Sequence, residues 1–181
     1  KIRKIYFNAL DSHVQNKNNS KYFIDKLPLN IIHVGEIIRI FPNAKFIVSI
    51  RHPCDCVLSC FMQNFEINDA MANFFNLKDA AHLYDAVMNL WMQYKSVFSI
   101  NYHEVKYENL IQNFKPIIKS ILNFLELSWD DSMLDYSKIA KKRGQIGTPS
   151  YAQVTKPIYL HASGRWKRYK KQTANIYPIL E

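Results

Sequence analysis

The sequence has few glycines, few cysteines and no long apolar run. It has four glycines in 181 residues and no G-x-x-x-x-G-K-S/T segment, which excludes a standard P-loop within this chain. Its three cysteines, Cys54, Cys56 and Cys60, form an odd, clustered set. That argues against disulfides and predicts a reducing compartment, the cytoplasm. No apolar run approaches the roughly 18 residues that a spanning helix needs.

Acidic residues are outnumbered by basic ones, 15 to 24, which gives a formal net charge of +9. This balance favours an anionic partner, such as a nucleotide, a sulfated substrate, nucleic acid or a membrane surface. Hydrophobic residues make up 48% of the chain and charged residues 22%. At this length, the composition predicts one globular domain over residues 1–181, with a sizeable core.

Hydrophobic periodicity predicts strands that alternate with helices, and therefore a parallel α/β sheet. The predicted strands cover residues 22–24, 44–50 and 103–107. Helices are predicted over 2–10, 30–40, 54–64 and 79–98, and from near Pro116. Asn30 is the expected cap of the second helix. Residues 65–78 are expected to form a short helix or a loop over the site. The last helical stretch opens at Gly164 and is interrupted at Pro178.

The most informative segment is FPNAKFIVSIRHPCDCVLSC, residues 41–60. It predicts a buried strand that ends at Arg51 and turns at once into a helix, with Pro53 at the first helical position. Asp55 complements the helix dipole, and Ser59 lies two turns along. In open α/β sheets, ligands bind at the carboxyl ends of strands. An Arg beside a helix N-terminus there suits a phosphate. The alternative is an Arg at a strand edge and a Ser on a helix, without a ligand.

The pattern Arg-x-Pro-x-Asp-x-x-x-Ser resembles the 3′-phosphate-binding motif of sulfotransferases. The resemblance implies that Arg51 and Ser59 bind the 3′-phosphate of 3′-phosphoadenosine 5′-phosphosulfate (PAPS). Tyr107-Glu108-Asn109-Leu110 is similar to a family segment whose Tyr contacts the adenine, here Tyr107. As an alternative, Tyr107 is a core aromatic residue whose hydroxyl is satisfied.

Asp25-Lys26-Leu27-Pro28 resembles the D-K-x-P segment of the bacterial tetratricopeptide-linked and tyrosylprotein branch. In that branch, the Lys stabilises the bridging oxygen as the sulfuryl group leaves, which implies a catalytic role for Lys26. As an alternative, Lys26 is a surface residue beside a turn.

Residues 150–157 are similar to the S-x-x-Q-V-x-x-P segment of the same branch, and Gly164-Arg165-Trp166 to a Gly-x-Trp that closes over the nucleotide. The resemblance places further residues at the cofactor: Ser150 on its 5′ side, Trp166 over the nucleotide, and Lys156, Arg165 and Lys167 near the 3′-phosphate. As an alternative, the basic residues around 164–171 form only a solvated face.

The resemblance implies a P-loop-NTPase-like parallel sheet flanked by helices, of the sulfotransferase type and incomplete at its N-terminal side. The chain is expected to be the C-terminal two-thirds of such a domain. The 5′-phosphosulfate loop and the general base are expected to precede Lys1. The implied reaction moves a sulfuryl group from PAPS to a hydroxyl or amine acceptor, with the nucleotide 3′-phosphoadenosine 5′-phosphate (PAP) as product and without a metal.

Three alternatives stay open. The absent phosphate loop allows a catalytically inactive sulfotransferase-like binding domain. The net charge and the run GRWKRYKK allow nucleic-acid binding, although no recognised motif supports it. His52 and the three cysteines could in principle bind zinc, but helical spacing places only Cys56 and Cys60 on a common face.

Overall fold

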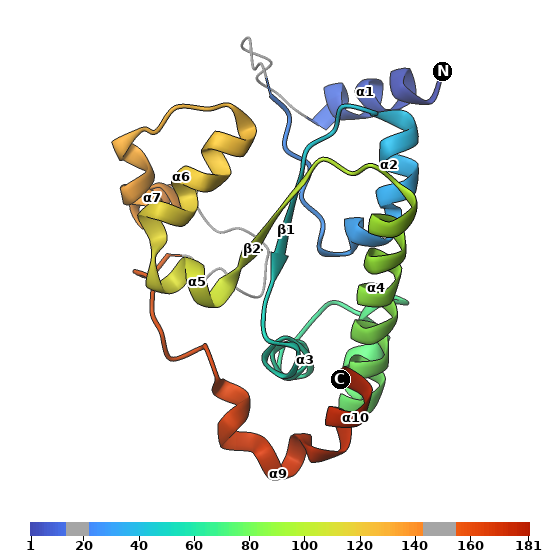
Figure 1. Cartoon of the computed structure of the whole chain (residues 1–181), viewed down its shortest axis with the longest axis vertical. Coiled ribbons are helices and arrows are strands. Elements are labelled where there is room, and N and C mark those ends of the chain that lie inside the picture. The colour runs from blue at the N-terminus through green and yellow to red at the C-terminus, as the bar shows by residue number, and fades with distance from the viewer. Residues whose placement is uncertain (14–21, 143–154) are drawn as a thin grey trace. The chain divides into compact units, whose positions relative to one another are not determined.

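The computed structural model describes residues 1–13, 22–142 and 155–181 (Figure 1). Its contacts separate the chain into two units. The first comprises residues 1–46 and 87–101, and the second comprises residues 47–86 and 102–181. The assignment of one domain over 1–181 stays a prediction. Within the described ranges, no helix combines the length and the apolarity needed to cross a bilayer.

The first unit is helical. Its elements are α1 (Ile2–His13), the 3-10 helix η1 (Pro28–His33), α2 (Val34–Ile40) and the second half of α4 (Leu77–Val97). Val34 of α2 and Trp91 of α4 are buried. The Tyr94 hydroxyl donates a hydrogen bond of 2.7 Å to the carbonyl of Ile32. A Cβ atom at Gly35 would lie 3.1 Å from the Tyr94 ring, so this close approach of the two helices favours glycine.

Two predictions for the first unit are wrong. Residues 22–24 form no strand. Asn30 does not cap a helix, because Pro28 already begins a 3-10 turn there and the Asn30 amide donates to the Asp25 carboxylate at 3.2 Å. The helix predicted over 2–10 is confirmed and extends to His13.

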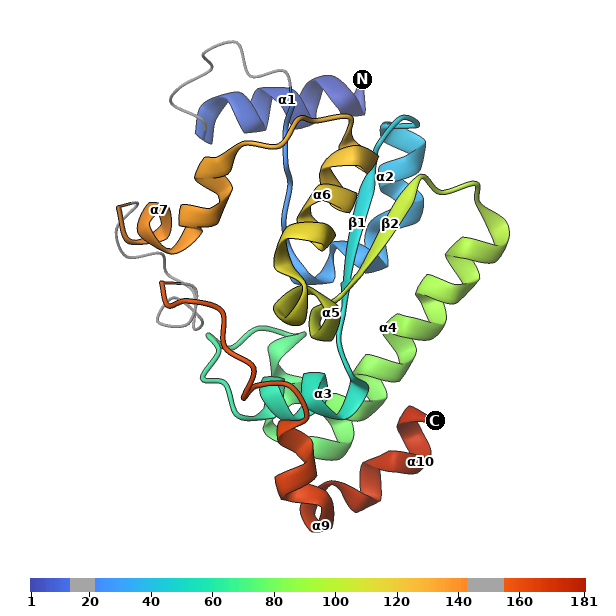
Figure 2. The same ribbon diagram turned by 60° about the vertical axis from the view of Figure 1, so that its left-hand side comes forward.

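The second unit contains the sheet. The sheet consists of β1 (Phe46–Ile50) and β2 (Tyr102–Lys106), which lie side by side and point the same way (Figure 2). Between them, the chain passes through α3 (Pro53–Phe61), the 3-10 helix η2 (Met71–Phe75) and α4. Parallel neighbours require such a crossover. The predictions of strands over 44–50 and 103–107 are therefore confirmed to within two residues at each end.

The remaining elements of the second unit follow β2. They are α5 (Tyr107–Gln112), α6 (Phe114–Leu125), η3 (Asp131–Asp135), α7 (Tyr136–Lys142), η4 (Arg165–Tyr169), α9 (Lys170–Thr173), η5 (Ala174–Ile176) and α10 (Tyr177–Leu180). Pro178 lies in the first turn of α10, where its missing N–H costs no hydrogen bond, so it does not interrupt the final helical stretch as predicted.

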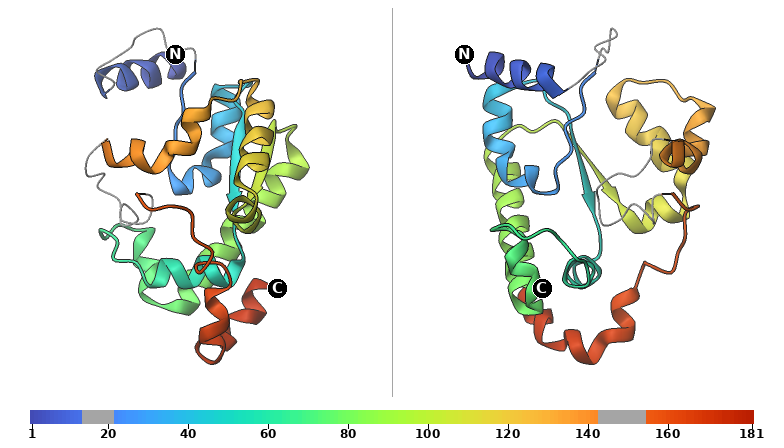
Figure 3. Two further views of the ribbon diagram at one scale, coloured as in Figure 1. Left: turned by 90° about the vertical axis from the view of Figure 1, so that its left-hand side faces the viewer. Right: turned by 180° about the vertical axis from the view of Figure 1, so that it is seen from behind.

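Helix α3 is fixed by its sequence at one end and by packing along one face. Pro53 is its first residue, as predicted. Val57 packs against Ala80 and Ala81 of α4 and against Ile176. The alanines leave room for close helix packing, and the chain's C-terminal end lies beside this cluster (Figure 3). This burial holds the N-terminus of α3 at the end of β1.

The boundaries of α3 and α4 differ from the prediction. Helix α3 ends at Phe61 rather than Asn64. Helix α4 begins at Leu77, because the Asn76 side chain accepts hydrogen bonds from the backbone of Lys78 and Asp79, at 2.8 and 3.3 Å. Residues 65–78 contain η2, which agrees with the short helix predicted for that segment.

Candidate functional site

Arg51 lies where β1 ends and α3 begins, at the carboxyl edge of the parallel sheet. Its guanidinium carbon is 4.9 Å from the centre of the Tyr107 ring, and Tyr107 directly follows β2. One terminal nitrogen, Nη2, donates to the carbonyl of Ala162 at 2.5 Å. The same nitrogen lies 3.9 Å from the Asp55 carboxylate. Arg51 therefore joins the ends of both strands to the segment that precedes η4.

Asp55 is the buried centre of this arrangement. Its side chain is 0% exposed, although a carboxylate is rarely buried without partners. One oxygen accepts the backbone N–H of Gly164 at 2.6 Å, and the other accepts the backbone N–H of Trp166 at 2.8 Å. Gly164 has φ +69°, a conformation that favours glycine. Asp55 thus holds a turn that lies far away in the sequence.

Trp166 is enclosed by ring contacts. The His52 imidazole stacks on it with centroids 4.9 Å apart and planes at 21°, and Tyr177 meets it edge-on at 5.7 Å. The backbone N–H of His52 donates to the Glu108 carboxylate at 2.9 Å. The residues that flank the expected motif positions therefore also connect the two strand ends.

Two buried donors of this group have no hydrogen-bond partner among the described residues: Nε of Arg51 and Nε1 of Trp166. An unsatisfied buried donor costs about 1–3 kcal/mol, so such groups require an explanation. Both nitrogens can only donate in these protonation states. An acceptor that is not among the described residues, such as an anionic oxygen, would satisfy these two donors.

Ser59 lies on α3, four residues after Asp55, which itself follows Arg51 by four residues. Helical residues at this spacing share a face, so Ser59 and Asp55 lie on one side of α3. Ser59 is half-buried. The predicted pair Arg51 and Ser59 therefore belongs to one short strand–helix unit.

Burial and the charge of Arg51 both shift the pKa values of nearby ionisable groups. Burial raises the pKa of the Tyr107 phenol, while the Arg51 charge acts in the opposite direction. A hydrogen bond from Cys60 lowers the pKa of the Cys56 thiol, and Arg51 lowers it further. The Cys60 pKa is raised correspondingly. Burial also raises the pKa of Tyr84 to about 12.

The other predicted cofactor residues are less completely connected. Arg165 is half-buried in η4, and Lys167 is exposed. The Lys167 side chain lies along Gly164, with Cδ 3.6 Å from where a Cβ would stand. Lys156 is exposed, and its carbonyl accepts from the Tyr136 hydroxyl at 3.3 Å. Ser150 lies outside the described residues.

Lys26 belongs to the first unit and is exposed. The residue before it is anchored, because the Asp25 carboxylate accepts from the Tyr6 hydroxyl at 3.0 Å and from the Asn30 amide. This fixes the backbone next to Lys26 and leaves its ammonium group in solvent.

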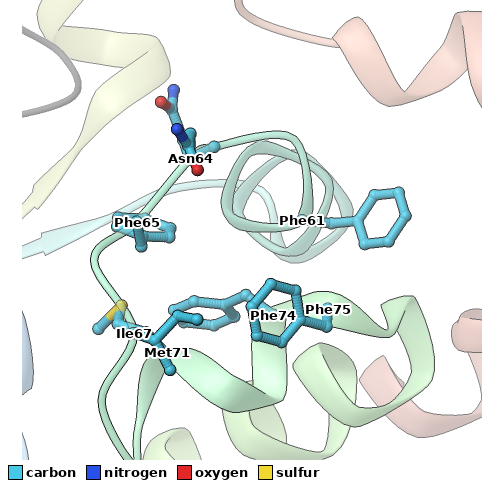
Figure 4. A pocket seen from close by; sticks show the side chains of 8 residues that line it. Phe61, Asn64, Phe65, Ile67, Met71, Phe74 and Phe75 are labelled. Atoms are coloured by element: carbon cyan, nitrogen blue, oxygen red, sulfur yellow. The ribbon is translucent and has the colours of Figure 1, made fainter.

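A small pocket lies where α3 ends, between that end and η2 (Figure 4). Its aromatic lining includes Phe61, Phe65, Phe74 and Phe75. Its volume of about 120 Å³ is well below the 300–1,000 Å³ that is typical of ligand sites, so it cannot hold a nucleotide. Among the described residues, no cluster of three or more His, Cys, Asp or Glu side chains is placed to hold a metal ion.

A family model described as "Sulfotransferase family" matches residues 2–131. The chain belongs to the sulfotransferase family. It is 33% identical over 162 residues to an uncharacterized protein of Aquifex aeolicus, an alignment that covers 87% of this chain and 20% of that protein. It is 24% identical over 152 residues to protein-tyrosine sulfotransferase 2 of Gallus gallus, which covers 81% of this chain and 40% of the relative.

A solved sulfotransferase domain from the curacin biosynthetic pathway has a similar fold. The TM-score is 0.64 at 17% identity, with 99% of this chain and 67% of the other covered. The predicted family and the α/β sulfotransferase fold are therefore confirmed. The chain spans only a fifth of the Aquifex protein and less than half of the protein-tyrosine sulfotransferase from chicken.

Three members of the site have no predicted role at the nucleotide. His52 and Glu108 are adjacent to predicted residues, but their hydrogen bond depends on the pairing of the strands. Asp55 was assigned only to the helix dipole. Its spacing of four residues from Arg51 was the available signal.

Proposed function

We propose that this chain forms the 3′-phosphate and adenine side of a PAPS site, and that the protein transfers a sulfuryl group to a hydroxyl or amine acceptor. The observation that carries the proposal is the pair of buried, unsatisfied donors on Arg51 and Trp166. They lie at the carboxyl edge of a parallel sheet, where α/β folds bind ligands. Membership of the sulfotransferase family supports the same conclusion.

Each residue has a distinct role in this proposal. Arg51 and Ser59 bind the 3′-phosphate, and charge-assisted hydrogen bonds from the guanidinium strengthen that contact. Tyr107 locates the adenine ring, and its own ring packs against the Arg51 guanidinium. Trp166 donates its indole N–H to the same phosphate. Arg165, Lys167 and Lys156 add positive charge around the 3′-phosphate, and Ser150 contacts the 5′ side.

Lys26 is the proposed catalytic residue. The donor, when bound, supplies the sulfuryl group, and negative charge grows on the phosphate that leaves. A lysine ammonium group near the bridging oxygen stabilises that charge more in the transition state than in the ground state, which is the requirement for catalysis. The anchored Asp25 carboxylate holds the backbone next to Lys26. Positioning and charge stabilisation also dominate phosphoryl transfer, the nearest well-understood template.

Calorimetric titration with PAP tests the proposal. We expect saturable one-to-one binding that weakens with salt, since the contact is ionic. Adenosine 5′-monophosphate, which lacks the 3′-phosphate, is the matched control ligand and should bind at least about tenfold more weakly, a difference of about 1.4 kcal/mol. Equal binding of the two nucleotides, or none by the folded chain, would reject the 3′-phosphate assignment.

A second candidate is a catalytically inactive binding domain of the same fold. The observation that favours it is the lack of a G-x-x-x-x-G-K-S/T segment among the 181 residues. The two candidates differ in turnover. PAP binding without sulfuryl transfer from PAPS to any phenol, sugar or amine acceptor would favour the binding domain, whereas any transfer would exclude it. The three free cysteines suit either candidate in a reducing compartment such as the cytoplasm.

A further inference from the structure

The buried carboxylate of Asp55 carries a negative charge close to the proposed phosphate site. It lies 3.9 Å from Arg51, inside a site proposed to bind a phosphate. A negative charge at that distance repels an anionic ligand, and burial makes the repulsion stronger than it would be in water. A carboxylate in this place therefore needs a function that outweighs its charge.

The hydrogen bonds of Asp55 provide that function. Both of its oxygens accept backbone N–H groups, from Gly164 at 2.6 Å and Trp166 at 2.8 Å. The Arg51 guanidinium donates to the carbonyl of Ala162 in the same segment. Residues 162–166 are thus fastened to the start of α3 at three backbone atoms, two of them through Asp55.

The fastened segment carries groups that the proposed function uses. Trp166, with its unsatisfied indole nitrogen, and Arg165 lie within it, and Lys167 adjoins it in η4. Gly164 contributes its left-handed backbone conformation, which lets two amides so close in sequence reach the same carboxylate.

We propose that Asp55 is the positioning residue of the site: it clasps residues 162–166 onto the N-terminus of α3 and so sets the geometry of Arg51 and Trp166 for a 3′-phosphate. This inference rests on the proposed nucleotide function, but the clasp itself can be tested without a nucleotide. The direction in which one substitution changes the PAP affinity distinguishes a positioning role from a purely electrostatic one. Asp55→Asn removes the negative charge, so a purely electrostatic role predicts tighter PAP binding, whereas positioning predicts weaker binding.

The experiment compares the full chain with Asp55→Asn and with the control Asp69→Asn. Asp69 is exposed, lies in the same unit and changes the formal charge equally. For Asp55→Asn we expect at least about a tenfold loss of PAP affinity, together with little change for adenosine 5′-monophosphate. A general loss of folding would weaken both nucleotides. Unchanged or tighter PAP binding by Asp55→Asn would overturn the proposal.

Hydrogen–deuterium exchange tests the clasp independently of any ligand. In Asp55→Asn, exchange in a peptide covering 160–169 should rise by about tenfold or more, while β1 and β2 stay protected as in Asp69→Asn. If the wild-type chain binds no PAP, the proposed function fails, but this comparison still decides whether Asp55 holds the segment. Unchanged exchange at 160–169 would reject the clasp.

A second variant covers the case in which Asp55→Asn does not fold. Gly164→Ala leaves Asp55 intact, and the added Cβ meets only the Lys167 side chain, at 3.6 Å. It strains the turn only through its φ of +69°. We expect faster exchange at 160–169 and a loss of PAP affinity of about three- to tenfold. No change in either measurement would count against the proposal.

Discussion

The Arg51 guanidinium lies over the Tyr107 ring, 4.9 Å from its centre, where the two parallel strands end. Arg51 follows β1 and Tyr107 follows β2, so this contact joins two segments far apart in the sequence. A guanidinium that stacks on an aromatic face leaves its N–H edge available for bidentate binding of an anion. The pair is therefore suited to place one phosphate relative to one base.

Removal of the Arg51 side chain should weaken PAP binding. For Arg51→Ala we expect a loss of about 1.5–3 kcal/mol in binding free energy, since a charge-assisted contact is lost. Arg51→Lys keeps the charge but not the planar fork, so its loss should be intermediate. The exposed Arg39, in the first unit, supplies the matched control Arg39→Ala. Isothermal titration measures all three, and wild-type affinity in Arg51→Ala would contradict the site assignment.

The role of Tyr107 depends on its ring rather than its hydroxyl. Tyr107→Phe keeps the surface on which Arg51 stacks, so PAP affinity should stay within about threefold of wild type. Tyr107→Ala removes both that surface and the proposed adenine contact, and stacking on an aromatic is worth about 1–3 kcal/mol per base. Titration with PAP compares the two variants, and equal effects would exclude a stacking role.

Lys26 should affect turnover and not nucleotide affinity. Loss of one group that stabilises transition-state charge lowers kcat by about 10²–10³ in comparable sites. We therefore expect Lys26→Ala to reduce sulfuryl transfer by that order while PAP binding stays unchanged. The exposed Lys4 of the same unit provides the control Lys4→Ala. Equal turnover of Lys26→Ala and the control would remove Lys26 from the mechanism.

The cysteines of α3 should differ in their reaction with iodoacetamide. Hydrogen bonding from Cys60 and the charge of Arg51 lower the pKa of Cys56, whereas burial raises the pKa of Cys54. Only the thiolate reacts, so the rate–pH curve of Cys56 should lie at lower pH than that of Cys54. Removal of the charge in Arg51→Ala should move the Cys56 curve to higher pH.

Peptide mass spectrometry after timed labelling measures each thiol separately. Cys54 is the internal control, because Arg51 is not among the groups that shift its pKa. Coincident curves for Cys54 and Cys56, or a Cys56 curve unmoved by Arg51→Ala, would contradict the arrangement of Arg51 beside these thiols.

The core of the first unit should depend strongly on Trp91, which is only 1% exposed. Replacement of a buried Trp by Ala costs about 3–5 kcal/mol through lost burial and the cavity that remains. Met92, the next residue of α4, is 56% exposed, so Met92→Ala should change the free energy of unfolding by less than about 1 kcal/mol. Urea unfolding measures both, and similar losses would contradict the packing of α4.

Much of the second unit could be predicted from local sequence. The strand and helix on either side of Arg51 follow from an apolar β-prone run, a Pro at the first helical position and a helical apolar face, all of which act within a few residues. The same local signals failed around Asn30, where Pro28 begins a 3-10 turn first. They also assigned Pro178 to a break, although a proline in the first turn is compatible with a helix.

The sequence by itself determined the strand–Arg–helix unit, the parallel α/β class and the family, because these depend on local periodicity and short motifs. Only the tertiary structure decided that Asp55 faces the backbone of Gly164 and Trp166, and that Glu108 accepts from His52. Local propensity cannot encode such pairs. Their partners are separated by long stretches of chain and are brought together by the pairing of the strands and the packing of α3.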